Sequence, residues 1–249
     1  MSGHSKWHNI KIRKQAQDKQ KSKIFGKFSR EIITAAREGG GDPDSNARLR
    51  TALDKARQGG MPQENVKRAI QRGTGETEGV AFESAVYEGY GPGGVAILVE
   101  VLTDNRNRVV SELRRVFTRN GGNLAESNAV AWLFERKGVV LVPVEKASED
   151  AVMETALEAG AEDMQTDETS YEIRTEPAGL DDVKKALDTA NIGYDSAEVT
   201  MLPQTRVTLG EKEAHQVLRL MDALEDLDDV QQVYANFDIP DQIMEAVAA

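Results

Sequence analysis

The 249-residue sequence contains no cysteine, which excludes a disulfide framework, a thiolate nucleophile and a cysteine-ligated zinc or iron–sulfur site. The same absence is typical of a protein from a reducing cytoplasm. The longest apolar stretches, "GGVAILVEVL" and "GVVLVPV", fall short of the ~18 residues that a membrane-spanning helix needs. No apolar segment follows the positive N-terminal residues, so a secretory signal is not expected. We therefore expect a cytoplasmic protein that does not contact a membrane.

Residues that would support catalysis or metal binding are also scarce. His215 has no recognisable Ser or Asp partner, and no pair of carboxylates has a spacing typical of acid–base catalysis. His4 and His8 are spaced like some zinc ligands, but no third ligand lies nearby. "DPDSN" departs from a calcium-binding loop because Ala47 and Leu53 stand where the loop needs glycine and glutamate. The sequence predicts no enzyme activity, no metal and no cofactor.

The sequence does have a strong separation of charge. Residues 1–78 contain 17 Lys and Arg against 9 Asp and Glu, whereas residues 79–249 contain 14 against 33. The two parts therefore carry +8 and −19, which sum to the formal net charge of −11. The Debye length at physiological salt is ~8 Å, so a distant acidic domain cannot cancel a basic surface. A polyanionic partner is compatible with this acidic chain.

The acidic run "EDLDD" at 225–229 indicates a solvated face, with protein docking as the alternative.

The candidate nucleic-acid-binding residues lie mainly in an N-terminal arm and on one side of the first predicted helix. Polyanion binding needs several Lys or Arg that reach phosphates together. A tryptophan in the arm can stack on a base or enter a groove, or it can fold back as a hydrophobic anchor. A solvated helix face, or docking on the chain's own acidic domains, would also explain the cations. The candidates are Lys6, Trp7, Lys11, Arg13, Lys14, Lys19, Lys23, Lys27, Arg30, Arg106 and Arg108.

The last two candidates belong to "TDNRNR", which lies between a predicted strand and a predicted helix. Asp104 or Asn105 can cap that helix. Arg106 and Arg108 then lie at the helix start, where the helix dipole disfavours cations. Binding of a ligand would explain two arginines there, and simple exposure to solvent would explain them equally well.

Residues 1–78 predict a small three-helix unit with a basic tail. A helical period begins at Asp18, with apolar residues on one side and cations on the other. The glycines of "GGGDPD" end this helix. A second helix, capped by Asp44 or Ser45, follows, and a third helix runs from "GGMP" to Gly73. "GTGETEG" is typical of a linker.

The rest of the chain predicts a mixed α+β architecture. "AVYEGYGPGGVAILVEVL" indicates two strands joined by a turn, "RNRVVSELRRVFTRNGG" a helix and "AVAWLFERKG" another strand. Six elements follow in the order βαββαβ, which is the ferredoxin-like arrangement. They are a strand at 139–144, a helix at 148–159, strands at 161–166 and 171–175, a helix at 180–190 and a strand at 197–202.

A later helix and the strand "VQQVYANF" cannot extend this finished unit, so we expect them to complete the earlier strands. The βαββαβ unit is then an insertion. The predicted domains are an N-terminal basic three-helix domain at 1–78, a discontinuous α/β middle domain at 79–137 and 204–249, and an inserted ferredoxin-like domain at 138–203.

A series of motifs runs along the first half of the chain: "GHSKW" before a Lys-rich helix, "GGMP", "YEGYGPGG", "DNRNR", "GGNL" and "WLFERKG". Together, in this order, they resemble the YebC family of bacterial regulatory proteins, which includes the mitochondrial translational activator of cytochrome oxidase. One departure is Asn128, beside a turn, where the resemblance leads us to expect a small residue such as Gly.

The resemblance implies three domains, the third inserted into the second, and no catalytic activity. Bacterial members are described as probable transcriptional regulators that bind DNA, while the mitochondrial branch and some bacterial members act on translation at the ribosome. We expect a DNA-binding transcriptional regulator, with duplex DNA as the favoured partner and acidic domains that contact protein. The alternative is a ribosome-associated translation factor. Because aromatic residues make up only 5% of the chain, this alternative would bind RNA by backbone and shape.

Overall fold

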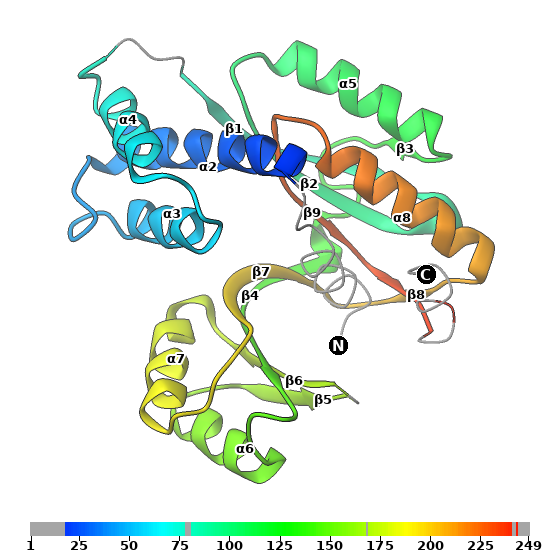
Figure 1. Ribbon diagram of the computed structural model, residues 1–249. Coiled ribbons are helices and arrows are strands. Elements are labelled where there is room, and N and C mark those ends of the chain that lie inside the picture. Colours follow the sequence, from blue (N-terminus) through cyan, green and yellow to red (C-terminus); the bar gives the residue numbers. More distant parts are fainter. Residues whose placement is uncertain (1–17, 78–80, 168, 241–242, 244–249) are drawn as a thin grey trace.

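The structure, a computed structural model, describes residues 18–77, 81–167, 169–240 and 243. A helical unit comes first, and two four-stranded sheets with helices packed against them follow (Figure 1). The predicted α+β class is confirmed, including the βαββαβ unit. Within the described ranges, none of the helices has the length and apolar character that crossing a membrane requires.

The helical unit consists of α2 (Asp18–Gly39), α3 (Ala47–Gln58) and α4 (Gln63–Gly73). Its core forms because each helix turns an apolar stripe inward. Ile32 and Leu49 are completely buried there, and Met61 closes the turn between α3 and α4. The predicted three-helix arrangement is therefore present in the part of the chain from residue 18 onward.

Asn46 caps α3, so the predicted caps Asp44 and Ser45 are wrong. The side-chain Oδ1 of Asn46 accepts a hydrogen bond from the backbone N–H of Leu49 at 3.0 Å. Its Nδ2 donates to the carbonyl oxygen of Ala35 in α2 at 2.8 Å. A side-chain amide can accept and donate at once, which a carboxylate cannot. Asn46 thus fixes α3 against α2 as well as starting it.

The first sheet has the strand order β3-β1-β2-β9, and its neighbours pair antiparallel. Its strands are β1 (Glu83–Tyr90), β2 (Ala96–Thr103), β3 (Asn123–Leu124) and β9 (Val230–Ala235). One face is covered by α5 (Arg106–Arg119) and α8 (Glu211–Glu225), which lie side by side in Figure 1. The late helix and strand therefore join the earlier elements in one sheet unit.

The predicted strand "VQQVYANF" is interrupted at Asn236. The side-chain Oδ1 of Asn236 accepts a hydrogen bond from the backbone N–H of Ala96 at 2.8 Å, and the residue is buried. Beyond it, β10 (Phe237–Asp238) leaves the first sheet and pairs parallel with β8 (Val207–Thr208). One predicted strand is thus two strands in two sheets.

The second sheet is contiguous in sequence and has the order β5-β6-β4-β7. Its unit consists of β4 (Phe134–Pro143), α6 (Glu149–Glu158), β5 (Asp163–Thr166), β6 (Ser170–Thr175), α7 (Leu180–Thr189) and β7 (Ser196–Pro203). The separate strands predicted for "AVAWLFERKG" and 139–144 are wrong, because Ala131–Leu133 is a 3-10 helix and the single strand β4 runs from Phe134 to Pro143. β4 pairs with β7 from Phe134 onward, which draws the end of "AVAWLFERKG" into this sheet. The predicted domain boundaries stay predictions, although β4 starts before residue 138.

A buried carboxylate organises the loop that leads into β4. Glu88, on β1, is 6% exposed, and its two side-chain oxygens accept three backbone hydrogen bonds. The donors are the N–H groups of Asn128 at 2.6 Å, Val130 at 2.7 Å and Ala131 at 2.8 Å. Asn128 has a positive φ of 68°, a conformation that asparagine tolerates and glycine adopts freely. This conformation explains why a glycine was expected at Asn128.

We predict that Glu88→Gln destabilises the protein by about 2–3 kcal/mol, because the amide offers one acceptor oxygen to three buried or partly buried donors and its NH₂ group would face at least one of them. Urea denaturation measures the loss. Glu126→Gln is the matched control, since Glu126 is exposed in the same loop. Equal midpoints for the two variants would contradict the prediction.

Candidate nucleic-acid interface

The basic side of α2 lies on the acidic loop between α8 and β9. Lys23 Nζ is 3.3 Å from Asp226 Oδ1, and Lys27 Nζ donates to the carbonyl oxygen of Glu225 at 2.7 Å. Residues three or four apart share a helix face, so Lys23 and Lys27, together with Arg30, can reach one loop. The expected solvated face is present at Asp226 and Asp228, which are exposed, but the expectation is wrong for Asp229, which is buried where α2 docks.

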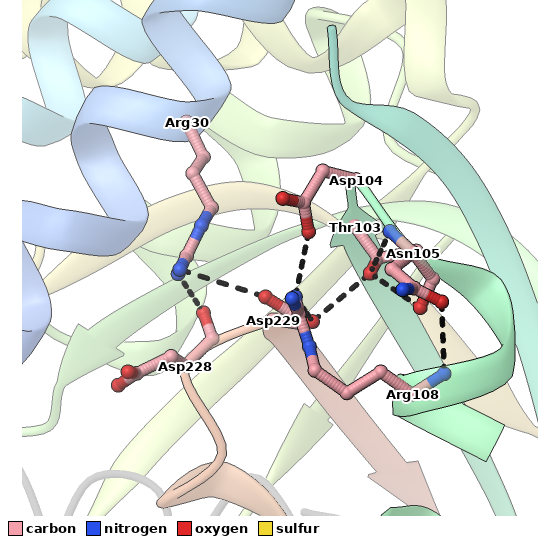
Figure 2. A network of polar contacts seen from close by, with 7 residues as sticks. All are labelled: Arg30, Thr103, Asp104, Asn105, Arg108, Asp228 and Asp229. Atoms are coloured by element: carbon pink, nitrogen blue, oxygen red, sulfur yellow. Dashed lines mark hydrogen bonds and ion pairs between the residues drawn. The ribbon is translucent and has the colours of Figure 1, made fainter. Parts of the chain in front are cut away.

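Asp229 is the centre of this contact, and Figure 2 shows cations approaching it from two helices. Its side chain is only 4% exposed. Arg30 Nη2 lies 3.5 Å from Asp229 Oδ1, and the Arg30 guanidinium also donates to the carbonyl oxygen of Asp228. On the other side, Arg108 Nη2 donates to Asp229 Oδ2 at 2.7 Å and Thr103 Oγ1 donates to the same oxygen at 2.9 Å. One buried carboxylate thus connects α2, the end of β2 and α5.

The "DNRNR" segment supplies the α5 side of this network. Asn105, one of the two predicted caps, is the N-cap of α5. Its Oδ1 accepts a hydrogen bond from the backbone N–H of Arg108 at 3.0 Å. Arg108 sits in the first turn, where the helix dipole is unfavourable to it, but Asp104 Oδ1 at 2.6 Å and Asp229 compensate. Hydrogen bonds with Asp229 and Asp104 raise the pKa of Arg108 above its ordinary value. Arg106 pairs with Glu83 at 2.7 Å.

The contacts in this network differ in strength. Lys23 and Asp226 are both exposed, by 49% and 71%, so water and salt screen them and the pair contributes ~0–1 kcal/mol. Arg30 is 22% exposed and faces a buried carboxylate, so the loss of either partner leaves a poorly solvated charge. Arg30 also lies over the ring of Phe82, 5.6 Å from its centroid. The Arg30–Asp229 pair is therefore the main attachment of α2 to the loop.

A second junction joins the helical unit to the other sheet. Lys55 Nζ of α3 lies 3.6 Å from Glu198 Oε2 of β7. Close by, Tyr234 Oη donates to Glu100 Oε2 at 3.4 Å. Burial raises the pKa of Glu100, an effect that Tyr234 and Arg136 partly oppose. Burial and the neighbouring carboxylate of Glu100 also raise the pKa of Tyr234.

The predicted site residues thus fall into three groups. The arm residues Lys6, Trp7, Lys11, Arg13 and Lys14 lie outside the described residues, as does the side chain of Lys19. The α2 cations meet the acidic loop, which matches the alternative of docking on the chain's own acidic domains. The two arginines of "DNRNR" pair with carboxylates, and Arg108 shares Asp229 with Arg30.

Sequence reasoning missed a fourth group of cations. Arg114, Arg115 and Arg119 are exposed on α5, and within the described part of the chain they form no ion pair. The signal was present, because α5 holds five arginines and one glutamate in 14 residues of an otherwise acidic segment. The apolar period of this helix predicts only its buried side and gives no information about the cations on the opposite side.

Comparisons with known proteins agree with the motifs. A family model described as "TACO1/YebC protein N-terminal domain" matches residues 5–76, and one described as "TACO1/YebC second and third domain" matches residues 82–237. Proteins named "Probable transcriptional regulatory protein" from Persephonella marina and Syntrophobacter fumaroxidans are 55% and 53% identical, each over 100% of both chains. The crystal structure of a conserved hypothetical protein from Aquifex aeolicus is 50% identical, with a TM-score of 0.80, over 90% of this chain and 93% of that one.

We predict that Asp229→Asn lowers the free energy of unfolding by about 2–3 kcal/mol, because Arg30 and Arg108 then share no buried counter-charge. Urea denaturation and hydrogen exchange of α2 amides measure the effect. Asp226→Asn is the matched control, since Asp226 is exposed and should cost less than ~0.5 kcal/mol. Unchanged exchange in α2 for Asp229→Asn would contradict the assigned role.

We also predict that Glu100→Gln stabilises the protein at pH 8 more than at pH 4. The pKa of Glu100 is raised in the folded state, so the folded state binds the proton more tightly and loses stability as pH rises through that pKa. Glutamine is neutral at both pH values, so the variant does not lose this folding stability as the pH rises. Urea midpoints of both proteins at the two pH values, with exposed Glu145→Gln as control, measure the difference. An advantage that is the same at pH 4 and pH 8 would refute the assignment.

Proposed function

The chain belongs to the TACO1/YebC family, and on that premise we propose that it is a non-enzymatic regulator that binds the backbone of duplex DNA. Its relatives are named probable transcriptional regulatory proteins, which supports a regulatory role for the family. The observation that carries the DNA-binding proposal is the charge of +8 on residues 1–78, in a chain whose net charge is −11. Such an isolated basic segment attracts phosphates over a distance that the acidic part does not cancel.

Because α2 is docked on the acidic loop, we assign different roles to the basic residues on α2 and to those that precede it. Lys23 and Arg30 already contact carboxylates, so we assign them chiefly to holding α2 in place. Lys6, Lys11, Arg13 and Lys14 precede α2 in the chain, and we assign the phosphate contacts to them. Phosphate contacts of this kind position a protein on DNA without reading its sequence. Trp7 can add stacking or a wedge between base steps.

The acidic remainder of the chain supports a second part of the proposal. Residues 79–249 carry −19, a charge that repels nucleic acid and favours basic protein surfaces. We therefore assign the two sheet units mainly to contacts with a protein partner.

The wild-type chain should bind a 30-base-pair duplex at 50 mM salt in gel-shift assays, and its affinity should fall steeply by 200 mM. The variant K6Q/K11Q/R13Q/K14Q should reduce the slope of log affinity against log salt by ~3.6, since each phosphate contact contributes ~0.9. The variant K146Q/K184Q/K185Q removes three cations from the inserted unit and is the control. No binding at 50 mM, or a flat salt response, would overturn the proposal.

A ribosome-associated role is the second candidate, because the matching family model also bears the name TACO1 and because ribosomal RNA offers the same phosphates. Sedimentation of cell extract through a sucrose gradient separates the two functions. Co-migration with ribosomes that survives DNase would favour translation and would count against duplex DNA as the main target.

A further inference from the structure

The outward face of α5 carries cations that neither the fold nor the basic arm accounts for. We propose that this face, formed by Ser111, Arg114, Arg115, Thr118 and Arg119, is a second contact surface for the backbone of duplex DNA. The inference rests on the proposed function and adds a site to it. The orientation of this face, the availability of its cations, its chemistry and its size support the proposal.

The orientation of α5 follows from its apolar residues. Val109, Leu113 and Phe117 are completely buried against the first sheet, which turns the opposite side of the helix outward. Arg114, Arg115 and Arg119 are exposed on the outer side. α5 lies at the outer edge of the molecule in Figure 1, beside α8. The face is therefore open to a large partner.

The availability of these cations distinguishes them from their neighbours. Arg106 and Arg108, at the start of the same helix, are held by Glu83 and by Asp104 with Asp229. Among the described residues, no carboxylate pairs with the three later arginines. Arg115 and Arg119 are four apart on one helix face, a spacing at which like charges repel. A bound polyanion would turn this unfavourable arrangement into a favourable one.

The chemistry of the face selects a phosphate backbone. The Thr118 hydroxyl lies with the guanidinium groups around a shallow hollow of about 500 Å³. The Ser111 hydroxyl also lines this hollow, but it donates to the carbonyl oxygen of Asn107 at 2.9 Å. Arginine and hydroxyl side chains are the usual donors to DNA phosphates. The five lining residues include no aromatic ring, and single strands are bound largely by base stacking on such rings. The face therefore suits a duplex better than a single strand.

The size of the face also fits a duplex. α5 has 14 residues, which corresponds to about 21 Å of helix at 1.5 Å per residue. A duplex rises 3.4 Å per base pair, so α5 can lie along about six base pairs of backbone. The three arginines lie between residues 114 and 119, within about 7.5 Å of helix axis, so they can reach neighbouring phosphates over about two base pairs.

The first test compares the variant R114Q/R115Q/R119Q with the wild-type chain in gel shifts with a 30-base-pair duplex. Removal of three phosphate contacts should reduce the salt slope by ~2.7, which corresponds to binding weaker by roughly 500-fold at 100 mM salt when the affinity at 1 M is unchanged. The control K146Q/K184Q/K185Q removes the same charge from the inserted unit and should change neither value. Equal losses in both variants would mean that only net charge matters, and the α5 site would be rejected.

The second test uses the absence of natural cysteine, which allows one labelled position. Thr118→Cys carrying a photocrosslinker should crosslink to the duplex, whereas Glu154→Cys on α6 should not. Crosslinking at neither position, with wild-type binding intact, rejects the α5 site and leaves the proposed function standing. A wild-type chain that binds no duplex rejects both. Crosslinking to co-purified protein in place of duplex would identify α5 as a protein-docking face and also reject the inference.

Discussion

The placement of the helical unit depends on the burial of one carboxylate. Asp229 is nearly inaccessible to water, so its charge requires compensation from groups that are held in place. Arg30 from α2 and Arg108 from α5 both supply it, and Thr103 completes the set (Figure 2). Because the cost of a buried unpaired charge is several kcal/mol, the two helices are strongly favoured in positions where they share this partner.

Because Asp229 and its loop require cations of the chain itself, the net charge of a segment does not equal the charge that is available to a partner. The excess of cations in residues 1–78 suggests a uniform basic surface, but part of it neutralises the loop at 225–229. Conversely, the acidic segment 79–249 contains α5, whose later arginines have no carboxylate partner within the described residues. Net charge per segment therefore indicates that a polyanion can bind a segment, but it does not identify the cations that contact it. The pairing of each cation is what separates a structural residue from an available one.

The sequence predicted most elements of the fold but not their ends or their partners. Hydrophobic period is a local property, so α2, α5 and the six elements of the βαββαβ unit could be identified from it. The cap at Asn46, the break at Asn236 and the single strand β4 depend on hydrogen bonds to other segments of the chain, which a local hydrophobic period does not reveal. The sequence also did not predict that Asp229 is buried, because burial of this carboxylate is favourable only when the arginines of α2 and α5 pack against it.

The shared carboxylate also relates the two proposed DNA contacts to each other. The basic arm precedes α2 in the sequence, and α5 carries the arginine face, so Arg30 and Arg108 on Asp229 fix α2, the helix that follows the arm, relative to that face. Two contact surfaces that are held in a fixed relation bind one duplex more tightly than the same surfaces on a flexible chain, because less freedom is lost on binding. An acidic residue that never touches DNA can therefore increase affinity for it. Its effect would arise entirely from the geometry that it imposes on the cations around it.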